Sequence, residues 1–475
     1  MAENIRDEIV AKRRARIGEQ GFTEGADVPR RRETPIVPFL GANGLICEVK
    51  RRSPSKGDIA PGLDAVDQAG IYLRAGARNL SVLTVPEGFG GSLDDLMRIK
   101  KRFPEAAVLR KDFLFDNNDI DVAWRAGADA VLLIAGMLSA DQLAMMYHCA
   151  KSLGLEALVE IHDEEDLRKA AAFAPNLVGI NSRDLTTFRI DPLLPVRMKA
   201  DITWDARVVY ESGIGHPDQA DFAIASGFQG LLVGEGVVRN PDLAGQLLEA
   251  MAGARPARFW PEIGRRLAAA GERPLVKICG LAREEDARLA ASLGADVLGF
   301  VFWPKSPRCT EAALLERLAD VEIPKVAVTV NPAGAAGLDP DVLALLRDGL
   351  LDAVQLHGDE TPDDCARLWP VSYKALRPRD AGEAAVAEGY RCPRVLLDAA
   401  ADVPGGSGKR VSLEVLEAWR QPLWLAGGIT PDNAARIASA RHPELLDIAS
   451  GVEEAPGVKS ADLMKKLFAS LKPFE

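Results

Sequence analysis

The chain has 475 residues and a formal net charge of −11, and this length is too great for one ordinary core, so we expect two domains. The acidic balance argues against a nucleic-acid partner, because neutralising phosphate groups requires a basic surface. The sequence has no apolar run of membrane-spanning length, and we expect no membrane partner and a cytoplasmic protein.

Residues 1–21, MAENIRDEIVAKRRARIGEQG, are amphipathic and densely charged, without the apolar core of a signal peptide. We expect the first 40 residues to form helices packed against one end of the first domain. The six cysteines are scattered, which suits a reducing compartment and predicts neither a disulfide framework nor a zinc site. With five histidines and no HExxH motif, the sequence predicts no metal ion.

A helix-like segment that ends at glycine and leads into a short apolar strand recurs along the chain, as in WRAGADAVLLI and LAASLGADVLGFV. Glycine supplies the left-handed helix end, and the apolar run is typical of a strand buried on both faces. In the first half the predicted strands cover 46–50, 79–83, 107–111, 130–134, 156–161, 177–181, 207–212 and 230–234. In the second half they cover 275–279, 297–302, 325–330, 353–357, 372–376, 394–399, 422–427 and 445–450.

Eight strand–helix units in each half indicate an α/β protein with two tandem (β/α)8 (TIM) barrels, the first with an N-terminal helical extension. The alternative, a doubly wound open sheet, would need fewer strands and a glycine-rich first turn that the sequence lacks. We place the first barrel at 1–255, a linker with a short amphipathic helix at 256–273, and the second barrel at 274–475.

Charged residues gather at the predicted carboxyl ends of the first-half strands, where barrels of this kind hold their active sites. They are Glu48, Lys50, Lys111, Glu160, Asn181, Arg183, Glu211 and Ser212. Glu48 and Lys50 are two positions apart, so they point to the same side of one strand. Any one of these residues alone could belong to a solvated ion pair at the rim. As a set they indicate a polar cleft, because buried charges are costly unless they are paired.

Glycine-rich loops predict a phosphate site in each half, because glycine lets backbone N–H groups approach an anion closely. In the first half the residues are Ser53 of the segment SPSKG, with Gly213, Gly234 and Glu235 after the last two strands; for Glu235 only the backbone N–H is expected to contribute. In the second half they are Gly427, Gly428, Ser450 and Gly451. The alternative is that these glycines only form tight turns.

The strand ends of the second half carry a different set of side chains: Cys279, Arg308, Gln355, His357 and Asp398. A thiol and a carboxyl across a phosphate-anchored cleft suit proton transfer between adjacent carbons and an oxygen. His357 either orients the substrate or is a structural histidine at the barrel mouth. The glycine-rich loop 403–410 is a candidate lid.

The motifs EVKRRSPSKG, RKDF, LVEIHDEEDL, GINSRDL and ESGI make the first half similar to indole-3-glycerol-phosphate synthase. The motifs KICGL, KSPR, VQLHG, LLDA, GGSGK, LAGGI and DIASGVE make the second half similar to phosphoribosylanthranilate isomerase. The order resembles that of fused bifunctional enzymes of tryptophan biosynthesis. This resemblance implies two consecutive enzymes that act on small phosphorylated substrates without a cofactor, and we expect a monomer.

In the first half, the resemblance implies that Lys111 is the general acid that protonates the substrate carbonyl during ring closure, and that Glu160 is the acid and base for dehydration. It also implies that Glu48 assists and that Lys50 pairs with the substrate carboxylate. Asn181, Arg183, Glu211 and Ser212 would then shape the sugar-phosphate pocket. We expect the charges around Lys111 to tune it to donate a proton near neutral pH.

In the second half, the resemblance implies that Asp398 is the general acid that opens the ribose ring and that Cys279 is the base that removes the C2′ proton. Arg308 would hold the anthranilate carboxylate. A histidine-pathway isomerase on a related barrel is the nearest alternative, but it would use two aspartates. The other alternative is that one barrel is a catalytically inactive scaffold.

Overall fold

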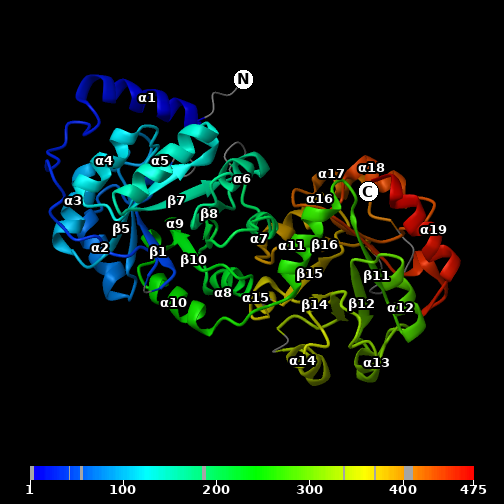
Figure 1. Cartoon of the computed structure of the whole chain (residues 1–475). Helices are drawn as coiled ribbons and strands as arrows, with labels where there is room; N and C mark the ends of the chain where they lie inside the picture. Colours follow the sequence, from blue (N-terminus) through cyan, green and yellow to red (C-terminus); the bar gives the residue numbers. More distant parts are fainter. Residues whose placement is uncertain are drawn as a thin grey trace. The chain divides into compact units, whose positions relative to one another are not determined.

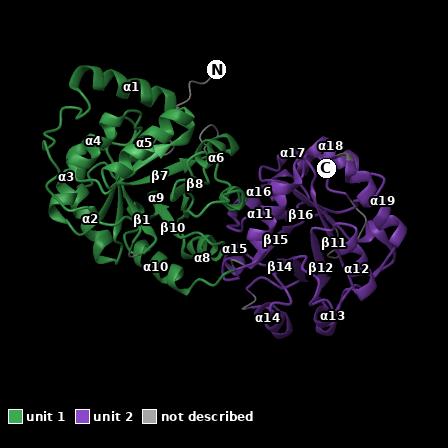
Figure 2. Cartoon of the chain, viewed as in Figure 1, with its two compact units in different colours: residues 1–256 green, residues 257–475 purple. Residues whose placement is uncertain are grey.

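The structure is a computed structural model that describes residues 5–41, 43–53, 57–184, 189–334, 337–368, 371–400 and 410–474. The chain forms two compact units, Met1–Pro256 and Ala257–Glu475 (Figure 2). In the part of the chain that is described, no helix combines the length and the apolar composition needed to cross a bilayer.

The first unit is a closed barrel of eight parallel strands (Figure 1). Its strands are β1 (Leu45–Val49), β4 (Asn79–Leu83), β5 (Ala107–Lys111), β6 (Ala130–Ile134), β7 (Glu156–Ile161), β8 (Leu177–Asn181), β9 (Arg207–Glu211) and β10 (Gly230–Val233). Each pairs with its neighbours in sequence, and β1 also pairs with β10, which closes the barrel. The predicted strands of the first half are thus confirmed. The strands are buried on both faces because side chains fill the barrel interior and helices cover its outside.

The helices of the first unit comprise α1, which precedes the first strand, and helices that follow the strands. They are α1 (Ile5–Gln20), α2 (Ala65–Arg74), α3 (Leu93–Arg102), α4 (Asn117–Ala126), α5 (Ala140–Ser152), α6 (Glu164–Ala171), α7 (Leu194–Ala200), α8 (Pro217–Ala225), α9 (Glu235–Arg239) and α10 (Leu243–Gly253). Several begin at a side chain that accepts a backbone N–H; Asp116, for example, forms a capping box with Asp119. A two-stranded hairpin, β2 (Arg52–Ser53) with β3 (Gly57–Asp58), follows β1.

The sequence predicted that the N-terminal extension packs against one end of the first barrel. In the structure it reaches both ends. Its only helix among the described residues is α1, from which Ile9 packs near Leu83 and Val85 at the carboxyl ends of the strands. Further along, Phe39 and Leu40 join the core near the amino ends. After α1 the described part of the extension contains turns and irregular chain, which connect the two ends of the barrel.

The second unit is a separate closed barrel with the same plan (Figure 1). Its strands are β11 (Leu275–Cys279), β12 (Val297–Val301), β13 (Lys325–Thr329), β14 (Ala353–Leu356), β15 (Ser372–Leu376), β16 (Val395–Leu397), β17 (Trp424–Ala426) and β18 (Leu445–Ile448). A hairpin, β19 (Glu453–Ala455) with β20 (Val458–Lys459), follows β18. All sixteen predicted strands therefore occur, and the two-barrel fold is confirmed.

The helices of the second unit are α11 (Phe259–Ala270), α12 (Glu284–Ser292), α13 (Ala312–Arg317), α14 (Pro340–Arg347), α15 (Pro362–Ala366), α16 (Ala381–Ala385), α17 (Leu413–Ala418), α18 (Ala434–Arg441) and α19 (Ala461–Leu471). Helix α11 lies in the stretch expected as a linker. Phe259, Trp260 and Ile263 of this helix are buried, and the two aromatic side chains pack on Tyr373 and Trp424 at the amino ends of β15 and β17. This helix therefore contributes to the core of the second unit.

The glycines that were predicted to end helices adopt left-handed backbone conformations. Gly127 follows α4 with a φ of 96°, and Gly294, before β12, has a φ of 98°. A residue with a Cβ would be strained at such an angle, so glycine ends the helix and allows the chain to turn directly into the next strand.

Candidate active sites

A cavity of about 500 Å³ lies at the carboxyl ends of the strands of the first barrel. It is lined by all the residues that the sequence proposed for this half: Glu48, Lys50, Ser53, Lys111, Glu160, Asn181, Arg183, Glu211, Ser212, Gly213, Gly234 and Glu235. Residues 54–56 of the SPSKG segment lie outside the described residues. Apolar side chains line the cavity as well, and among them Phe89 and Phe113 were not anticipated from the sequence.

Lys111, the last residue of β5, lies between two carboxylates from other strands. Its Nζ is 2.9 Å from Oε2 of Glu160 on β7 and 3.3 Å from Oε2 of Glu211 on β9. Burial disfavours the ammonium, but Glu160, Glu211 and Glu48 outweigh this effect and raise the pKa of Lys111. The expectation of a pKa near neutral is thus wrong, because carboxylates and not cations surround the lysine. Lys111 carries its proton throughout the neutral range.

The two carboxyls beside Lys111 differ in protonation. Burial disfavours charge on both, but Lys111 and His162 hold the pKa of Glu160 well below its usual range. Burial and the neighbouring Glu160 raise the pKa of Glu211 to about 8. At neutral pH the cavity therefore holds a cation, an ionised carboxylate and a carboxyl that retains a proton, which is the separation of roles that acid–base chemistry needs.

His162, directly after β7, was not proposed from the sequence. Its Nε2 is 3.1 Å from Oε1 of Glu160, and its Nδ1 is 3.6 Å from Oδ2 of Asp166. Burial lowers the pKa of this imidazole, but the two carboxylates raise it to about 9. The charged ring therefore helps to keep Glu160 ionised. The motif LVEIHDEEDL contains all three residues, but only the turn after β7 brings them together.

Glu48 and Lys50 point to the same side of β1, as their spacing predicted, and their charged groups are 2.9 Å apart. Room for the pair comes from Gly234 after β10, where a Cβ would lie 2.5 Å from Oε1 of Glu48 and 2.6 Å from Nζ of Lys50. Close by, Ser212 and Gly213 both have positive φ values, of 70° and 76°. The glycines of these loops are therefore needed for space and for backbone geometry.

Glu235 is the first residue of α9, next to the proposed phosphate loop. Its Oε1 is 3.0 Å from Nε of Arg239 on the same helix. Both residues line the cavity. The positive charge of Arg239 offsets the negative charge of Glu235. An anion near the Gly234 loop would therefore be repelled less by the Glu235 side chain.

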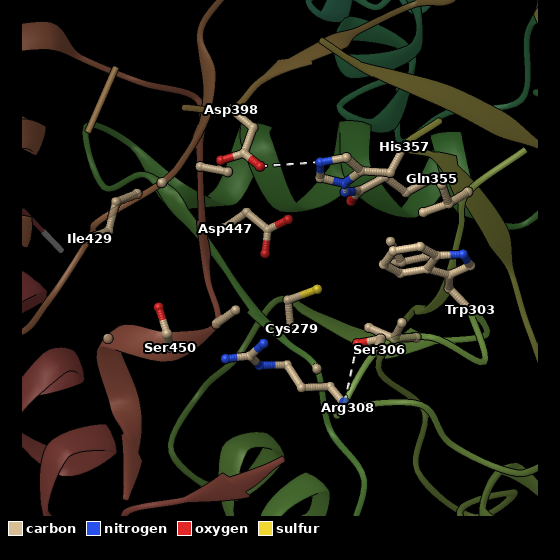
Figure 3. Close-up of a pocket in the computed structure, with 18 of the residues that line it drawn as sticks. Cys279, Trp303, Ser306, Arg308, Gln355, His357, Asp398, Ile429, Asp447 and Ser450 are labelled. Carbon is tan, nitrogen blue, oxygen red and sulfur yellow. Dashed lines mark hydrogen bonds and ion pairs between the residues drawn. The ribbon is translucent and has the colours of Figure 1, made fainter. Parts of the chain in front are cut away.

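The second barrel has its own cavity at the carboxyl ends of its strands (Figure 3). It is lined by all the residues proposed for this half: Cys279, Arg308, Gln355, His357, Asp398, Gly427, Gly428, Ser450 and Gly451. Figure 3 shows Ser450 and Ile429 on one side and Trp303 and His357 on the other, with Cys279 and Asp447 between them. Of the proposed lid loop, only Arg410 is among the described residues.

His357 forms two hydrogen bonds to other residues of the cavity. Its Nδ1 is 2.8 Å from Nε2 of Gln355, and its Nε2 is 3.1 Å from Oδ2 of Asp398. The histidine therefore links a buried amide to the carboxyl of Asp398. It orients that carboxyl from one side of the cavity.

Cys279, at the end of β11, has charged neighbours that the sequence reading passed over. Nζ of Lys277 is 3.5 Å from its Sγ and 2.6 Å from Oδ2 of Asp447 on β18. Burial and Asp447 raise the pKa of Cys279 to about 11, while Lys277 and Lys459 act in the opposite direction. Lys277 could have been found from the sequence, because it precedes Cys279 by two positions and so shares its face.

Arg308 lines the second cavity and is held by an acidic partner from the hairpin after β18. Its Nε and Nη2 donate to the carboxylate of Glu453, with Nη2 2.7 Å from Oε2. Lys459 donates to Glu453 at 2.8 Å and to the backbone oxygen of Cys279 at 2.6 Å. The hairpin therefore fixes both the arginine and the backbone of the cysteine. Among the described residues, no cluster of His, Cys, Asp and Glu is arranged to hold a metal ion.

Comparison with known proteins assigns a family to each unit. The family model "Indole-3-glycerol phosphate synthase" matches residues 6–249, and the model "N-(5'phosphoribosyl)anthranilate (PRA) isomerase" matches residues 276–470. The chain therefore belongs to the indole-3-glycerol phosphate synthase family, and its second unit is a phosphoribosylanthranilate isomerase domain. The resemblance proposed from the sequence motifs is confirmed for both halves.

Several known proteins are similar to one or both units. A multifunctional tryptophan biosynthesis protein of Schizosaccharomyces pombe is 30% identical over 90% of this chain and 59% of its own length. The tryptophan biosynthesis protein TRP1 of Phytophthora nicotianae is 28% identical over 99% of this chain and 97% of its own length. A solved phosphoribosyl anthranilate isomerase of Thermus thermophilus is 35% identical over 42% of this chain and all of that chain, with a TM-score of 0.37. The chain spans 59–61% of the length of the first three curated relatives.

Proposed function

We propose that the chain is a bifunctional enzyme that catalyses two consecutive steps of tryptophan biosynthesis. The second unit isomerises N-(5-phosphoribosyl)anthranilate to 1-(2-carboxyphenylamino)-1-deoxyribulose 5-phosphate. The first unit closes the ring of this product, with loss of carbon dioxide and water, to give indole-3-glycerol phosphate. The product of the second unit is thus the substrate of the first, so the fusion joins two steps of one sequence.

In the isomerase unit, Asp398 gives a proton to the ribose ring oxygen as the C1′–O bond breaks. Cys279 then takes the proton from C2′, and the resulting enolamine becomes the ketone. After Asp398 has lost its proton, His357 lies 3.1 Å from the carboxylate that remains and stabilises its charge. Gly427, Gly428, Ser450 and Gly451 bind the phosphate, and Arg308 binds the anthranilate carboxylate.

In the synthase unit, Lys111 protonates the substrate carbonyl oxygen as the ring carbon attacks it. Because its pKa is raised, Lys111 is protonated at neutral pH and can donate its proton to the developing alkoxide. Lys50 pairs with the substrate carboxylate, and Glu160, assisted by Glu48, acts in the dehydration. Asn181, Arg183, Glu211 and Ser212 contact the sugar-phosphate part.

The observation that carries the proposal is the pairing of acid and base groups from different strands within one cavity of each barrel. In the first unit Lys111 contacts Glu160 and Glu211, and in the second Cys279 and Asp398 line the same pocket. An inactive scaffold would not need such costly buried charges. The family membership of both units supports the same conclusion.

Two single substitutions test the proposal in the full chain. Cys279→Ala is expected to slow consumption of phosphoribosylanthranilate made in situ by about 10²–10⁴-fold, because a general base contributes that much. It should still convert added carboxyphenylamino-deoxyribulose phosphate at the wild-type rate. Lys111→Ala is expected to accumulate that intermediate, with indole-glycerol phosphate formation reduced about 10²–10⁴-fold.

Matched controls separate chemistry from general damage. Cys309→Ala removes an exposed thiol and Lys101→Ala an exposed ammonium, and both variants should keep both activities. If the wild type consumes neither substrate, or if each catalytic variant loses both activities together, the proposed division of labour is wrong.

Gly179→Ala tests the geometry of the first site. Gly179 lies on β8, where a Cβ would overlap Oε1 of Glu211. The Glu211 carboxyl must then move away from Lys111, and synthase activity is expected to fall about 10²-fold, the usual cost of a misplacement near 1 Å. Isomerase activity of the same variant should not change. Gly245→Ala on α10, where a Cβ meets open space, should leave both activities intact.

The phosphorylated small-molecule substrates follow from the proposed reactions. That the chain is a monomer and that it is cytoplasmic stay predictions from the sequence. Sedimentation of the purified chain would measure its oligomeric state directly.

A further inference from the structure

Lys277 is a fully buried lysine inside the second barrel, on the same face of β11 as Cys279. Its Nζ donates to Sγ of Cys279 at 3.5 Å. The neighbouring strand makes room for both side chains through Gly299, where a Cβ would lie 2.8 Å from Sγ of Cys279 and 2.9 Å from Cε of Lys277. Burying an ammonium is costly unless its partners repay it, so its position next to the thiol requires a physical reason.

Asp447 is the charged partner of Lys277. The two residues are paired in the β11–β18 register, and Nζ lies 2.6 Å from Oδ2. The other oxygen, Oδ1, is buried and has no hydrogen-bond partner among the described residues. Figure 3 shows the Asp447 carboxylate between Cys279 and Asp398. The pair thus places an ammonium and a carboxylate, with opposite effects on a thiol, beside the same sulfur atom.

Lys277 also begins a chain of hydrogen bonds that ends at Asp398. Oε1 of Gln355 accepts from Nζ of Lys277 at 2.5 Å and from the Tyr373 hydroxyl at 2.9 Å. These two donors fix the amide so that its Nε2 donates to Nδ1 of His357. The histidine proton is then on Nε2, from which it is donated to Asp398.

We propose that Lys277 is a positioning residue of the isomerase site, which stabilises the thiolate of Cys279 and, through Gln355 and His357, orients the carboxyl of Asp398. The inference rests on the proposed function, since it concerns the two groups that transfer protons there. One buried cation thereby serves both: it favours the form of Cys279 that accepts a proton, and it fixes the histidine tautomer that supports Asp398 after its proton is lost.

Other groups around the Cys279 sulfur bear on the direction of the effect. Asp447 on β18 and Asp398, directly after β16, line the cavity as acidic groups, whereas burial raises the pKa of the Tyr373 hydroxyl on β15, which is therefore neutral. Lys459 on β20 is bonded to the Cys279 backbone oxygen, and Arg308 packs against Gly280. Among the described residues, Lys277 is the cation whose ammonium donates to the sulfur itself, so its removal should disfavour the thiolate more than loss of a peripheral charge would.

The test measures the rate at which iodoacetamide alkylates Cys279 in the full chain at pH 8, with peptide mass spectrometry to follow this cysteine separately from the more accessible Cys149 and Cys309. Only the thiolate reacts, so below its pKa the rate reports the thiolate fraction. Lys277→Met should slow alkylation by about 3- to 30-fold, since an opposite charge at this range is worth about 1–3 pKa units and a more basic thiolate reacts somewhat faster.

Asp447→Asn supplies the opposite prediction. It removes the neighbouring negative charge and should accelerate alkylation by a similar factor, and the double variant should return close to the wild-type rate. Lys374→Met is the matched control, because Lys374 is equally buried in the same barrel but pairs with Glu360 at 2.8 Å, away from Cys279. Its alkylation rate should match that of the wild type.

The result that would overturn the proposal is an unchanged rate in Lys277→Met, or a change of the same sign in Lys277→Met and Asp447→Asn, which would indicate loosened packing only. If Lys277→Met does not fold, the Asp447→Asn variant tests the proposal instead. An alkylation rate of Cys279 that does not increase in this variant would contradict the charge effect. Alkylation needs no substrate, so it stands apart from the proposed reaction. If the wild type shows no isomerase activity but the variants show the expected changes in alkylation rate, the proposed reaction is wrong and the effect of Lys277 on the Cys279 thiolate still holds.

In a folded Lys277→Met variant, the dependence of isomerase kcat/KM on pH gives a second readout. Activity should rise with pH to a higher midpoint than in the wild type, because the base must lose its proton before it acts. A purely structural role would lower the rate at every pH without moving the midpoint.

Discussion

Arg13→Ala is expected to lower the free energy of unfolding of the first unit by about 3–5 kcal/mol, the usual cost of removing one partner from a buried ion cluster. Arg13 is fully buried on α1 and contacts Asp119 at 2.6 Å, Glu24 at 3.0 Å and Asp112 at 3.2 Å. It also donates to the backbone oxygen of Phe113, two residues after Lys111. Alanine would remove the ion-pair partner of the buried Asp119 and leave Asp112 and Glu24 with Arg110 and Arg16 alone. It would also remove a hydrogen bond that holds the backbone of Phe113, which lines the cavity.

The neighbouring arginine provides a control for this prediction. Arg14 is exposed, and its guanidinium lies 4.1 Å from the centre of the Phe115 ring, a contact worth about 0.5–1 kcal/mol at an exposed site. Hydrogen exchange of the full chain, followed by mass spectrometry in peptides of the first barrel, measures the unfolding of that unit separately from the second. Equal effects of Arg13→Ala and Arg14→Ala would mean that the buried cluster does not stabilise the unit.

Trp260→Ala should lower the free energy of unfolding of the second unit by about 3–5 kcal/mol, the usual range when a large buried aromatic side chain is removed. Trp260 on α11 is fully buried, and its ring centre lies 4.9 Å from that of Phe259, 5.9 Å from that of Trp424 and 6.3 Å from that of Tyr373. These aromatic rings fill the amino end of the barrel, and a cavity there has few atoms that can move in to fill it.

Trp303→Ala is the matched control, because this tryptophan is partly exposed at the mouth of the second cavity. Its loss should change the unfolding free energy far less than loss of Trp260 does. The same hydrogen-exchange measurement, made in peptides of β14 to β18, distinguishes the two variants. If Trp260→Ala costs no more than Trp303→Ala, α11 contributes little to the core, and residues 257–273 act as a connecting segment only.

The two cavities use opposite electrostatic arrangements on one fold. In the first, Glu160, Glu211 and Glu48 lie around Lys111 and raise its pKa, which suits a group that donates a proton. In the second, burial and Asp447 raise the pKa of the Cys279 thiol to about 11, and Lys277 and Lys459 act against this shift, which favours the form that accepts a proton. The same strand ends thus serve different proton transfers through the choice of charged neighbours.

The sequence by itself determined the strands and many of the polar residues that line both cavities. Apolar runs bounded by glycine set the strands, and the fold places the carboxyl ends of all eight strands at one end of the barrel, so residues at those ends share a cavity. Spacing of two along β1 was also sufficient to pair Glu48 with Lys50. The same rule applied to β11 would have joined Lys277 to Cys279.

Only the tertiary structure decided which charged groups touch. That Lys111 lies between Glu160 and Glu211, and that Gln355 and His357 connect Lys277 to Asp398, depends on the stagger of strands around each barrel. The burial of Arg13 depends on the packing of α1 against the first barrel, and that of Trp260 on the packing of α11 against the second. Local patterns fix the direction of a side chain along its own element, whereas its partner on a distant element is fixed by packing of the whole core.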